Sequence, residues 1–460
     1  MITCSNRSIC VCLHSGILLR RIVLILSCSL LLTGEVRAEV KSSNWTPELL
    51  RIANVDPVIK KAIELILIPS PPGNESRVAD QIVRELTRLG IVSRLDAHRN
   101  VLGAIPASPG YEQVPSLLLI AHMDIVPGDK RNPNKQIKPR LKEIDGREWL
   151  TSDGTTTLGA DDKAGVAAIL DVIAMLTGKH PRKKTPINHG PIEVALTVEE
   201  ETTGRGVIGL DATKLKSKYV LVIDGFRLYE IIWRLASTTE VTIKIHGARG
   251  GHSGEEIDRP DNINAIKVMS EVDSLIPQGV IRHDKDQVIT SINAGIASGG
   301  TAANVIAPEA QLEYLIRSTD PATETILLDG IRTNLMKVQT KYQEVQSEFR
   351  IDMEISKSLP AWSANPESSI LKLAQKSAEQ TSGQKVDPIS VHAGSDTSII
   401  GTNKRNSAGE AMEPILIGIA NIQGAHSTRE RLDWRSLLTG RDWLLKTITL
   451  LTENVQSQTK

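Results

Sequence analysis

The sequence predicts an α/β fold, in which a mostly parallel sheet flanked by helices is interrupted by a smaller α+β domain. Short apolar runs, typical of strands buried on both faces, alternate with stretches of helical periodicity. Near residue 236 this pattern gives way to strictly alternating apolar and polar residues. Strands that alternate with helices favour a parallel sheet, and the change of pattern indicates an inserted domain. With 460 residues, the chain is also long enough for two domains or more.

The α/β part contains four buried-type strands and several amphipathic helices. The strands are expected at residues 116–121, 191–198, 219–223 and 414–419. Helical periodicity predicts helices at residues 80–89, 161–176 and 369–381. The polar stretch from residue 129 to 147 predicts a surface loop.

The inserted part is expected to be a ferredoxin-like α+β domain. Its predicted elements are a strand at 240–246, a helix at 264–275, strands at 288–296 and 310–316, a helix at 322–338 and a strand at 348–355. This strand-helix-strand-strand-helix-strand order is that of a ferredoxin-like unit. The predicted organisation is a leader at 1–38, the first part of the α/β domain at 39–235, the insert at 236–356 and the second α/β part at 357–460.

The first 38 residues have the features of a signal peptide. Arg20 and Arg21 precede an apolar run at residues 22–32, and Val36-Arg37-Ala38 is a small-residue cleavage signature. The run is too short for a comfortable transmembrane helix. We therefore expect an exported protein, periplasmic or secreted, without stable membrane association once the leader is cleaved. An uncleaved membrane anchor is the alternative.

Composition excludes several classes of function. Lysine plus arginine equals aspartate plus glutamate at 54 each, so no global field favours nucleic acid or an acidic membrane. Aromatic residues make up 3% of the chain, which is few for stacking bases. All four cysteines lie in the leader. A mature chain without cysteine has no disulfides and no thiolate ligands, so a metal site would consist of His, Asp and Glu.

Acids and histidines follow three of the buried strands. His122 and Asp124 follow the first strand, the glutamates 199–201 follow the second, and Asp224 ends the third. Ligands of open α/β sheets bind outside the carboxyl ends of the strands, so these side chains are expected in one crevice. Carboxylates so close together repel one another, and a divalent cation would relieve this repulsion.

The pair of His122 with Asp124, and a further acid, Asp161, also have ordinary structural interpretations. Asp124 stands two residues after His122 in an extended segment, so its carboxylate can fix the tautomer of a metal-bound imidazole. The same pair could equally be a satisfied histidine beside a turn aspartate. Asp161 opens a predicted helix, where a carboxylate is also a common N-terminal cap. What favours a site is the position of three clusters of acids and histidine at three strand ends, rather than the types of these residues.

A glycine motif at residues 204–209 fits the G-x-G-x-x-G pattern of dinucleotide-binding proteins. It follows a strand, and Asp224 ends the next one. The three glutamates between the strand and the first glycine would repel a pyrophosphate. The sequence therefore disfavours an oxidoreductase.

Together these motifs resemble the superfamily of co-catalytic zinc enzymes that includes peptidase T, carboxypeptidase G and aminoacylase. The resemblance spans about residues 56–450 and is closest to peptidase T in TSDGTTTLGADDKAG, at 151–165, and in VIDG around Ile223. It implies two Zn²⁺ ions, with Co²⁺ or Mn²⁺ as alternatives, and a zinc-peptidase catalytic domain. The metal ligands that it implies are His122, Asp161, Glu201, Asp224 and His426.

The motifs of this superfamily imply a role for each residue. HMD implies His122 as a ligand with Asp124 as its orienting partner, and GADDK implies that Asp161 bridges both metals. TVEEE implies Glu200 as the general base towards a metal-bridged water. The chain has one residue more than usual after these glutamates, in TTGRG. A slipped register would make Glu199 the base and Glu200 the ligand.

The insert resembles the lid domain of these enzymes. GARGGHSG implies that His252 helps to bind the substrate or its tetrahedral intermediate. Asn304 and Arg317 occupy a similar supporting position, and the guanidinium of Arg317 suits a substrate carboxylate. Taken alone, Arg317 could be a surface residue of a strand. HAGSD, with Asp396, resembles a loop near the site whose role the resemblance does not assign.

The resemblance implies a metallo-exopeptidase that hydrolyses short peptides. Two alternatives stay open, namely an amidohydrolase that deacylates N-acyl amino acids and a metal-dependent binding protein without turnover. The expected partners are a peptide or an N-acyl amino acid, and a second copy bound through the lid, but no nucleic acid. The sequence does not distinguish a preference for the amino end of a peptide from one for its carboxyl end.

Overall fold

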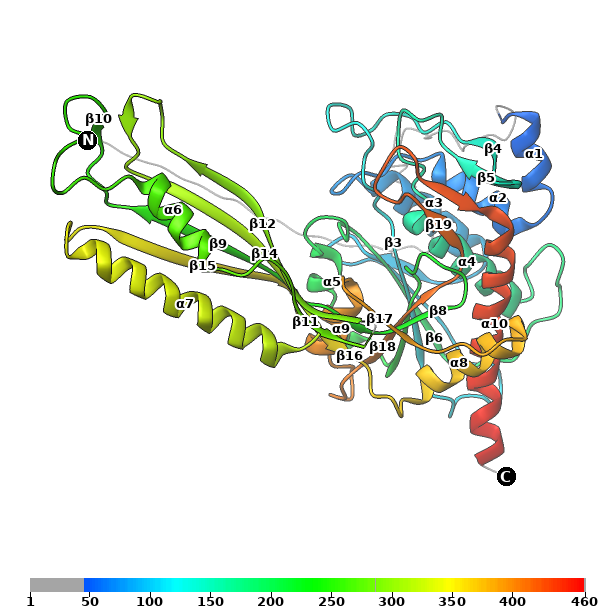
Figure 1. Ribbon diagram of the computed structural model, residues 1–460. Coiled ribbons are helices and arrows are strands. Elements are labelled where there is room, and N and C mark those ends of the chain that lie inside the picture. Colours follow the sequence, from blue (N-terminus) through cyan, green and yellow to red (C-terminus); the bar gives the residue numbers. More distant parts are fainter. Residues whose placement is uncertain (1–44, 286, 459–460) are drawn as a thin grey trace, which may run out of the picture. The chain divides into compact units, whose positions relative to one another are not determined.

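The centre of the α/β part is a nine-stranded sheet whose four middle strands run parallel (Figure 1). The computed structural model describes residues 45–458 except residue 286, so the predicted leader lies outside the described residues. The middle strands, in spatial order, are β6 (Ile192–Thr197), β3 (Leu117–His122), β7 (Tyr219–Val222) and β18 (Glu413–Gly418). The flanking strands are β1 (Ser93–Leu95), β2 (Val101–Ile105), β8 (Glu230–Leu235), β16 (Trp362–Ser363) and β17 (Ile389–Val391).

The middle strands form because their sequences are mostly apolar. Every residue of β3 and of β6 is buried, as expected of parallel strands covered on both faces. Their bounds differ from the predicted ones by one residue at each end. The prediction of a mostly parallel α/β sheet is thus confirmed, while the outer strands β2 and β8 pair antiparallel to their inner neighbours.

Helices cover both faces of this sheet. On one face, α5 (Arg205–Gly209) and α9 (Asp396–Asn403) share an apolar cluster with Leu118, Ile120 and Val220. On the other face, α4 (Ala160–Leu176) lies against β3, and all its residues are buried. The helices around α4 and at the edges are α1 (Pro47–Ala53), α2 (Pro57–Ile66), α3 (Ser76–Arg88), α8 (Ser369–Ser382) and α10 (Trp434–Gln458). A 3₁₀ turn at Ala212–Lys214 follows α5.

The insert contains the expected ferredoxin-like unit and one further strand. Its sheet has the spatial order β11 (Gly279–Asp284), β12 (Gln287–Gly299), β14 (Ala310–Ser318), β9 (Thr238–His246) and β15 (Arg350–Leu359). Helices α6 (Ala265–Ser274) and α7 (Pro321–Gln343) pack on one face, where α7 buries an apolar stripe that includes Leu327, Ile331 and Leu335 (Figure 1). Strand β11 was not predicted. The domain boundaries themselves stay predictions.

Two small sheets complete the described chain. One pairs β10 (Gly251–His252) with β13 (Val305–Ile306). The other has the order β19 (Asn421–Gln423), β20 (Arg431–Asp433), β5 (Arg147–Thr151) and β4 (Arg140–Ile144). The prediction of a loop throughout 129–147 was therefore wrong for its second half, which forms β4.

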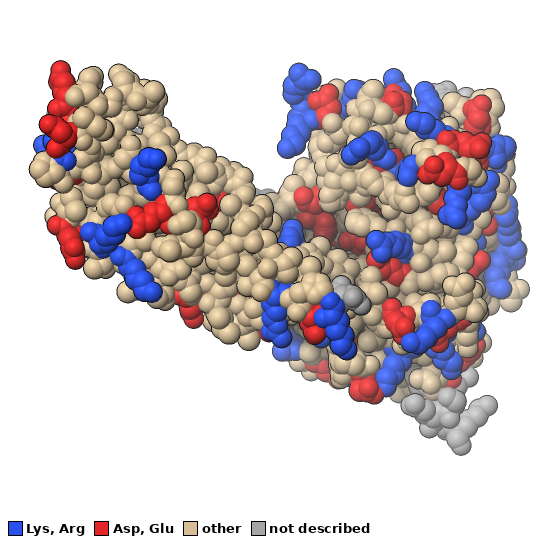
Figure 2. All heavy atoms as spheres, in the orientation of Figure 1, with Lys and Arg blue, Asp and Glu red and all other residues tan. Residues whose placement is uncertain are grey.

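Two surface properties follow from the described residues. No helix in this part of the chain is both long enough and apolar enough to cross a membrane. On the face drawn in Figure 2, basic and acidic side chains are mixed over the surface, in keeping with the equal numbers of the two kinds.

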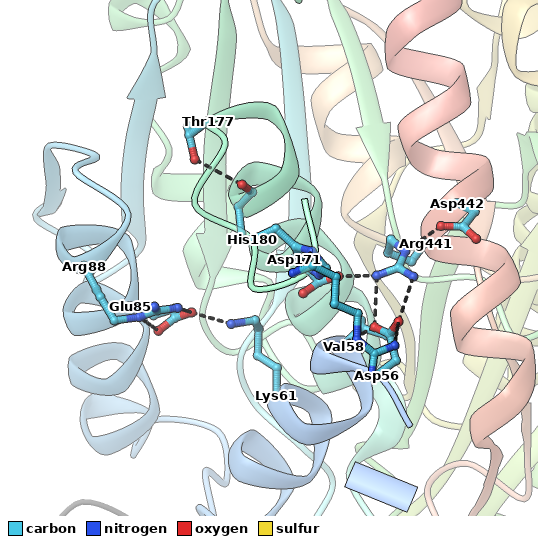
Figure 3. A network of polar contacts seen from close by, with 12 residues as sticks. Asp56, Val58, Lys61, Glu85, Arg88, Asp171, Thr177, His180, Arg441 and Asp442 are labelled. Carbon is cyan, nitrogen blue, oxygen red and sulfur yellow. Dashed lines mark hydrogen bonds and ion pairs between the residues drawn. The ribbon is translucent and has the colours of Figure 1, made fainter. Parts of the chain in front are cut away.

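A buried ion-pair network joins three helices of the α/β part (Figure 3). The Arg441 guanidinium on α10 donates to Asp171 on α4 and, over 3.2 Å, to Asp56, whose carboxylate also caps α2. Side chains of Arg441 and Asp171 are 5% and 1% exposed, so little water screens the pair. The exposed Asp442 accepts from the guanidinium Nε over 2.7 Å.

Replacing Arg441 by methionine should destabilise the protein strongly. The buried Asp171 carboxylate would lose its counter-charge and Asp56 would keep only the half-exposed Arg182, and such a loss typically costs about 3–5 kcal/mol of unfolding free energy. Asp442 is exposed, so replacing it by asparagine should lower the free energy of unfolding by less than about 1 kcal/mol. Urea unfolding of both variants measures the difference, and equal midpoints would contradict this account of the network.

Candidate metal centre

The carboxyl ends of three neighbouring parallel strands bring the predicted residues together. His122 is the last residue of β3 and lies opposite Thr197, the last residue of β6. Asp224 follows the end of β7, which pairs with the other side of β3. The glutamates 199–201 follow β6. Adjacent parallel strands end at one edge, so these side chains meet there.

The Asp161 carboxylate lies between two imidazoles. Its Oδ1 is 3.2 Å from Nε2 of His122, and its Oδ2 is 3.1 Å from Nε2 of His426. On the His122 side, Oδ1 of Asp224 is 3.5 Å from the same Nε2. On the His426 side, Oε2 of Glu201 is 3.0 Å from that Nε2. The five predicted ligands thus form two groups that share Asp161.

His426 reaches this position through the small four-stranded sheet. The loop between β19 and β20 contains His426 and Glu430, and β20 pairs with β5, which leads into the segment before Asp161. Glu430 accepts the backbone N–H groups of Gly159, over 2.8 Å, and Asp161, over 3.1 Å. Residues separated by about 270 positions are thereby held in contact. The sequence analysis assigned no role to Glu430.

Asp124 holds both the histidine and the glutamate segment. Nδ1 of His122 lies 3.0 Å from the backbone oxygen of Asp124 and 3.5 Å from its Oδ1. The two oxygens of this fully buried carboxylate accept the N–H groups of Glu200 and Glu201, each over 3.0 Å. Asp124 therefore orients the segment as well as the ring.

The three consecutive glutamates point to different partners. Glu201 meets His426, whereas Glu199 pairs with Arg205 over 2.5 Å and accepts from Thr203. The half-buried carboxylate of Glu200 makes no hydrogen bond or ion pair with any residue that the structure describes. The additional residue of TTGRG is accommodated in the turn, where the N–H of Gly204 bonds to the Glu199 carbonyl over 2.7 Å.

Close packing fixes the start of α4 against the sheet. A Cβ on Gly165 would lie 2.3 Å from the carbonyl oxygen of Ile223 and 2.3 Å from Oδ1 of Asp162. Asp162 in turn accepts the N–H of His122 over 3.3 Å. The absence of a side chain at Gly165 therefore allows the segment with Asp161 to approach the strand ends.

The centre contains an excess of buried negative charge. Burial, with the neighbouring charges of Asp161 and Glu201, raises the pKa of Asp224 to about 6 although His122 lowers it. Burial likewise raises the pKa of Glu430 to about 7 and that of Glu200 well above its usual value. Burial opposes protonation of His122, yet the surrounding carboxylates raise its pKa overall. The carboxylates of Asp161 and Glu201 raise the pKa of His426 to about 10.

These residues fit divalent metal ions. The donor set consists of two imidazole nitrogens and three carboxylates, which is a common combination around zinc. Oε1 of Glu201 is buried and has no hydrogen-bond partner among the described residues, so this oxygen is available to coordinate a metal ion inside the cluster. Two groups of ligand atoms are compact enough to surround an ion, one from His122, Asp161 and Glu201 and one from His122, Asp162 and Asp224.

A third compact group, Asp56, Asp171 and His180, differs in its electrostatics. The guanidinium of Arg441 already lies between the two carboxylates. Nδ1 of His180 accepts the N–H of Arg182 over 3.2 Å, so the neutral ring keeps its proton on Nε2. This group is an ion-pair network rather than a metal centre.

The three lid residues do not contact the metal cluster. His252 and Asn304 lie side by side, because β10 pairs with β13 and Ser253 donates to the Asn304 carbonyl over 3.0 Å. Arg317 lies on β14 and donates to Thr238 over 3.1 Å. Within the described part of the chain, no hydrogen bond or ion pair connects these three side chains to the cluster.

Asp396, whose role the sequence left unassigned, lies next to the centre. It is the first residue of α9, is 2% exposed, and accepts from the Thr197 hydroxyl over 2.9 Å. Burial raises its pKa to about 7. The position of HAGSD in the sequence gave no sign of this contact, because residues 197 and 396 belong to separate parts of the α/β domain.

Comparison with known proteins identifies relatives over most of the chain. The family model for "Peptidase family M20/M25/M40" matches residues 118–450. A peptidase T of Limosilactobacillus fermentum is 28% identical over 84% of this chain and 93% of its own length. The uncharacterized protein YqjE of Bacillus subtilis is 25% identical over 84% of this chain and 96% of its own. A tripeptidase structure from Staphylococcus aureus superimposes with a TM-score of 0.73 and 27% identity, covering 86% of this chain and 98% of that one.

Metal binding to the metal-free protein should release protons. With a pKa of about 10, His426 holds a proton at neutral pH, the carboxylates around His122 raise its pKa as well, and an imidazole must lose its proton to bind a metal. The apparent affinity for Zn²⁺ should therefore rise with pH between about 5 and 9, by roughly tenfold per unit for each proton released. Calorimetry in two buffers of different ionisation enthalpy counts the protons. Binding heats that do not depend on the buffer would show that the imidazoles are not ligands.

Proposed function

Because the chain belongs to the peptidase family M20/M25/M40, and is thus a hydrolase, we propose that it is a zinc-dependent exopeptidase for short peptides. The names of two relatives, a peptidase T and a tripeptidase, support short peptides as the substrate class. The observation on which the proposal depends is the position of Asp161, which directs one oxygen towards each imidazole. That position suits a carboxylate shared by two metal ions.

We assign the first metal to His122, Asp161 and Asp224, and the second to His426, Asp161 and Glu201. The chemistry that bound cations supply at such a site is polarisation of the scissile carbonyl and acidification of the attacking water. Co²⁺ or Mn²⁺ would suit the same oxygen and nitrogen donors.

Glu200 is the general base in this proposal. Its carboxylate is half-buried and forms no hydrogen bond or ion pair with any described residue, while its backbone N–H is held by Asp124. Burial raises its pKa, which brings a carboxylate closer to the value that suits proton transfer near neutral pH. Glu200 takes the proton of the attacking water and passes it to the leaving nitrogen.

The lid supplies substrate contacts in this proposal. Arg317 is half-buried, and its one hydrogen bond, to Thr238, leaves most of its donors available. That suits a substrate carboxylate. His252 and Asn304, which lie together on β10 and beside β13, are proposed to contact the peptide near the reacting carbonyl. A homodimer through the lid, and export directed by residues 1–38, remain part of the proposal.

Glu200→Gln should abolish most turnover and leave the metals bound. Loss of a general base typically lowers kcat by about 10²–10⁴-fold. Metal content, measured by plasma mass spectrometry, should equal that of the wild type because the Glu200 side chain forms no hydrogen bond or ion pair with the proposed metal ligands of the described chain.

Glu199→Gln is the matched control for this experiment. The Glu199 carboxylate forms an ion pair with Arg205 and a hydrogen bond with Thr203. The kcat of the Glu199→Gln variant should therefore stay within about threefold of the wild type. A large loss of kcat in Glu199→Gln, together with a loss of metal in Glu200→Gln, would show that the register is slipped by one residue.

A defined peptide library, digested and followed by mass spectrometry, tests the substrate class. Di- and tripeptides should be cleaved, and each product series shows whether the amino or the carboxyl end is removed. Cleavage of N-acyl amino acids without cleavage of free-amine peptides would instead indicate a deacylase. Activity that persists after chelation would contradict the proposed chemistry.

A further inference from the structure

The segment 392–396, HAGSD, contacts the lid, both strands that lead into the lid, and the metal centre. At its first residue, Nε2 of His392 lies 2.7 Å from the hydroxyl of Ser291 on lid strand β12. Ser291 lies opposite Arg317 in the register between β12 and β14. The Arg317 charge, in addition to burial, lowers the pKa of His392, so the imidazole also lies near the proposed substrate arginine.

The middle of the segment is fixed against the strands that connect the two parts. The N–H of Ala236, between β8 and β9, donates to the Ala393 carbonyl over 3.0 Å. A Cβ on Gly394 would lie 2.6 Å from Cδ1 of Leu359, at the end of β15, and 3.2 Å from the Ala236 carbonyl oxygen. Both connecting strands therefore press on this short stretch of backbone, which leaves it little room to move independently of them.

The end of the segment lies beside the metal ligands. Ser395 caps α9, accepting the N–H of Thr397, and Asp396 accepts from the Thr197 hydroxyl over 2.9 Å. Thr197 is paired with His122 across the sheet, and its carbonyl accepts the N–H of Met123 over 2.8 Å. A displacement of Asp396 thus acts on the strand end that positions His122.

We propose that residues 392–396 couple the position of the lid to the geometry of the metal centre, and that His392 is a positioning residue for the proposed peptidase reaction. The proposal rests on the proposed function for its kinetic consequence but not for its effect on the metal. Through the Ser291–His392 bond, a shift of lid strand β12, where Ser291 lies opposite Arg317, displaces the segment. The Asp396–Thr197 bond transmits the displacement to His122. Such coupling through a packed, hydrogen-bonded segment is established by measured interaction energies rather than by proximity alone.

A double-mutant cycle between the two ends of the segment tests the coupling. Ser291→Ala removes the lid contact and Thr197→Val removes the contact beside His122, with little change of volume. The two sites share no partner. If they act independently, the loss of kcat/KM in the double variant should equal the product of the losses in the two single variants, to within about twofold. Coupling predicts that the double variant loses at least about threefold less than the product of the single losses. Losses that simply multiply would overturn the proposal.

A second readout uses the metal itself. Proteins loaded with Co²⁺ are compared by visible absorption and by competition for the metal with a chelator. Ser291→Ala and His392→Ala should each shift the spectrum and weaken Co²⁺ binding, whereas His392→Gln, which can keep a donor near Ser291, should restore both. Ser298→Ala, on the same strand but without a side-chain bond, should leave both unchanged. Thermal unfolding of each variant identifies any that are merely destabilised.

The outcomes separate the two proposals. A wild-type protein that binds Co²⁺ but cleaves no peptide would contradict the proposed function, and the inference would then be judged on the spectra and affinities alone. An unchanged spectrum and unchanged affinity in both Ser291→Ala and His392→Ala would contradict the inference even if peptides are cleaved. A wild-type protein that binds no Co²⁺ would contradict both.

Discussion

The shared carboxylate of Asp161 is the constraint on which the rest of the site depends. One oxygen faces His122 and the other faces His426, so a displacement of this side chain would disturb both groups of ligands at once. Asp161 is buried among further acids, and such a concentration of negative charge is costly without cations. Its position is set by backbone contacts rather than by its own side chain. Glu430 holds its N–H, and the missing side chain of Gly165 lets the segment approach the sheet.

Each part of the fold contributes to that arrangement. The parallel strands β3, β6 and β7 end at one edge and supply His122, the glutamates and Asp224. The small four-stranded sheet brings the loop with His426 and Glu430 from the far end of the chain. The buried pairs of Arg441 hold α4, which begins at the metal centre, against α2 and α10. The stability of the helices and the geometry of the site are therefore connected.

The sequence predicted the four middle strands because their apolar runs form a distinctive pattern, whereas the outer strand β2, which is also mostly buried, was not predicted. Strands β3 and β6 are mostly apolar and fully buried, and were located to within one residue. Strands β4 and β11 are mostly exposed at the edges of their sheets, lack an apolar face, and were missed. The position of His426 depends on the pairing of β20 with β5. No local pattern encodes that pairing, so only the resemblance to known enzymes pointed to His426, and Glu430 was given no role.

The most direct test of the central claim is a crystal structure of the full chain loaded with Zn²⁺, with the ions located by anomalous scattering at the zinc edge. Two anomalous peaks should appear on either side of Asp161, one beside His122 and Asp224 and the other beside Glu201 and His426. A single peak at Asp56, Asp171 and His180, or no peak beside Asp161, would contradict the account.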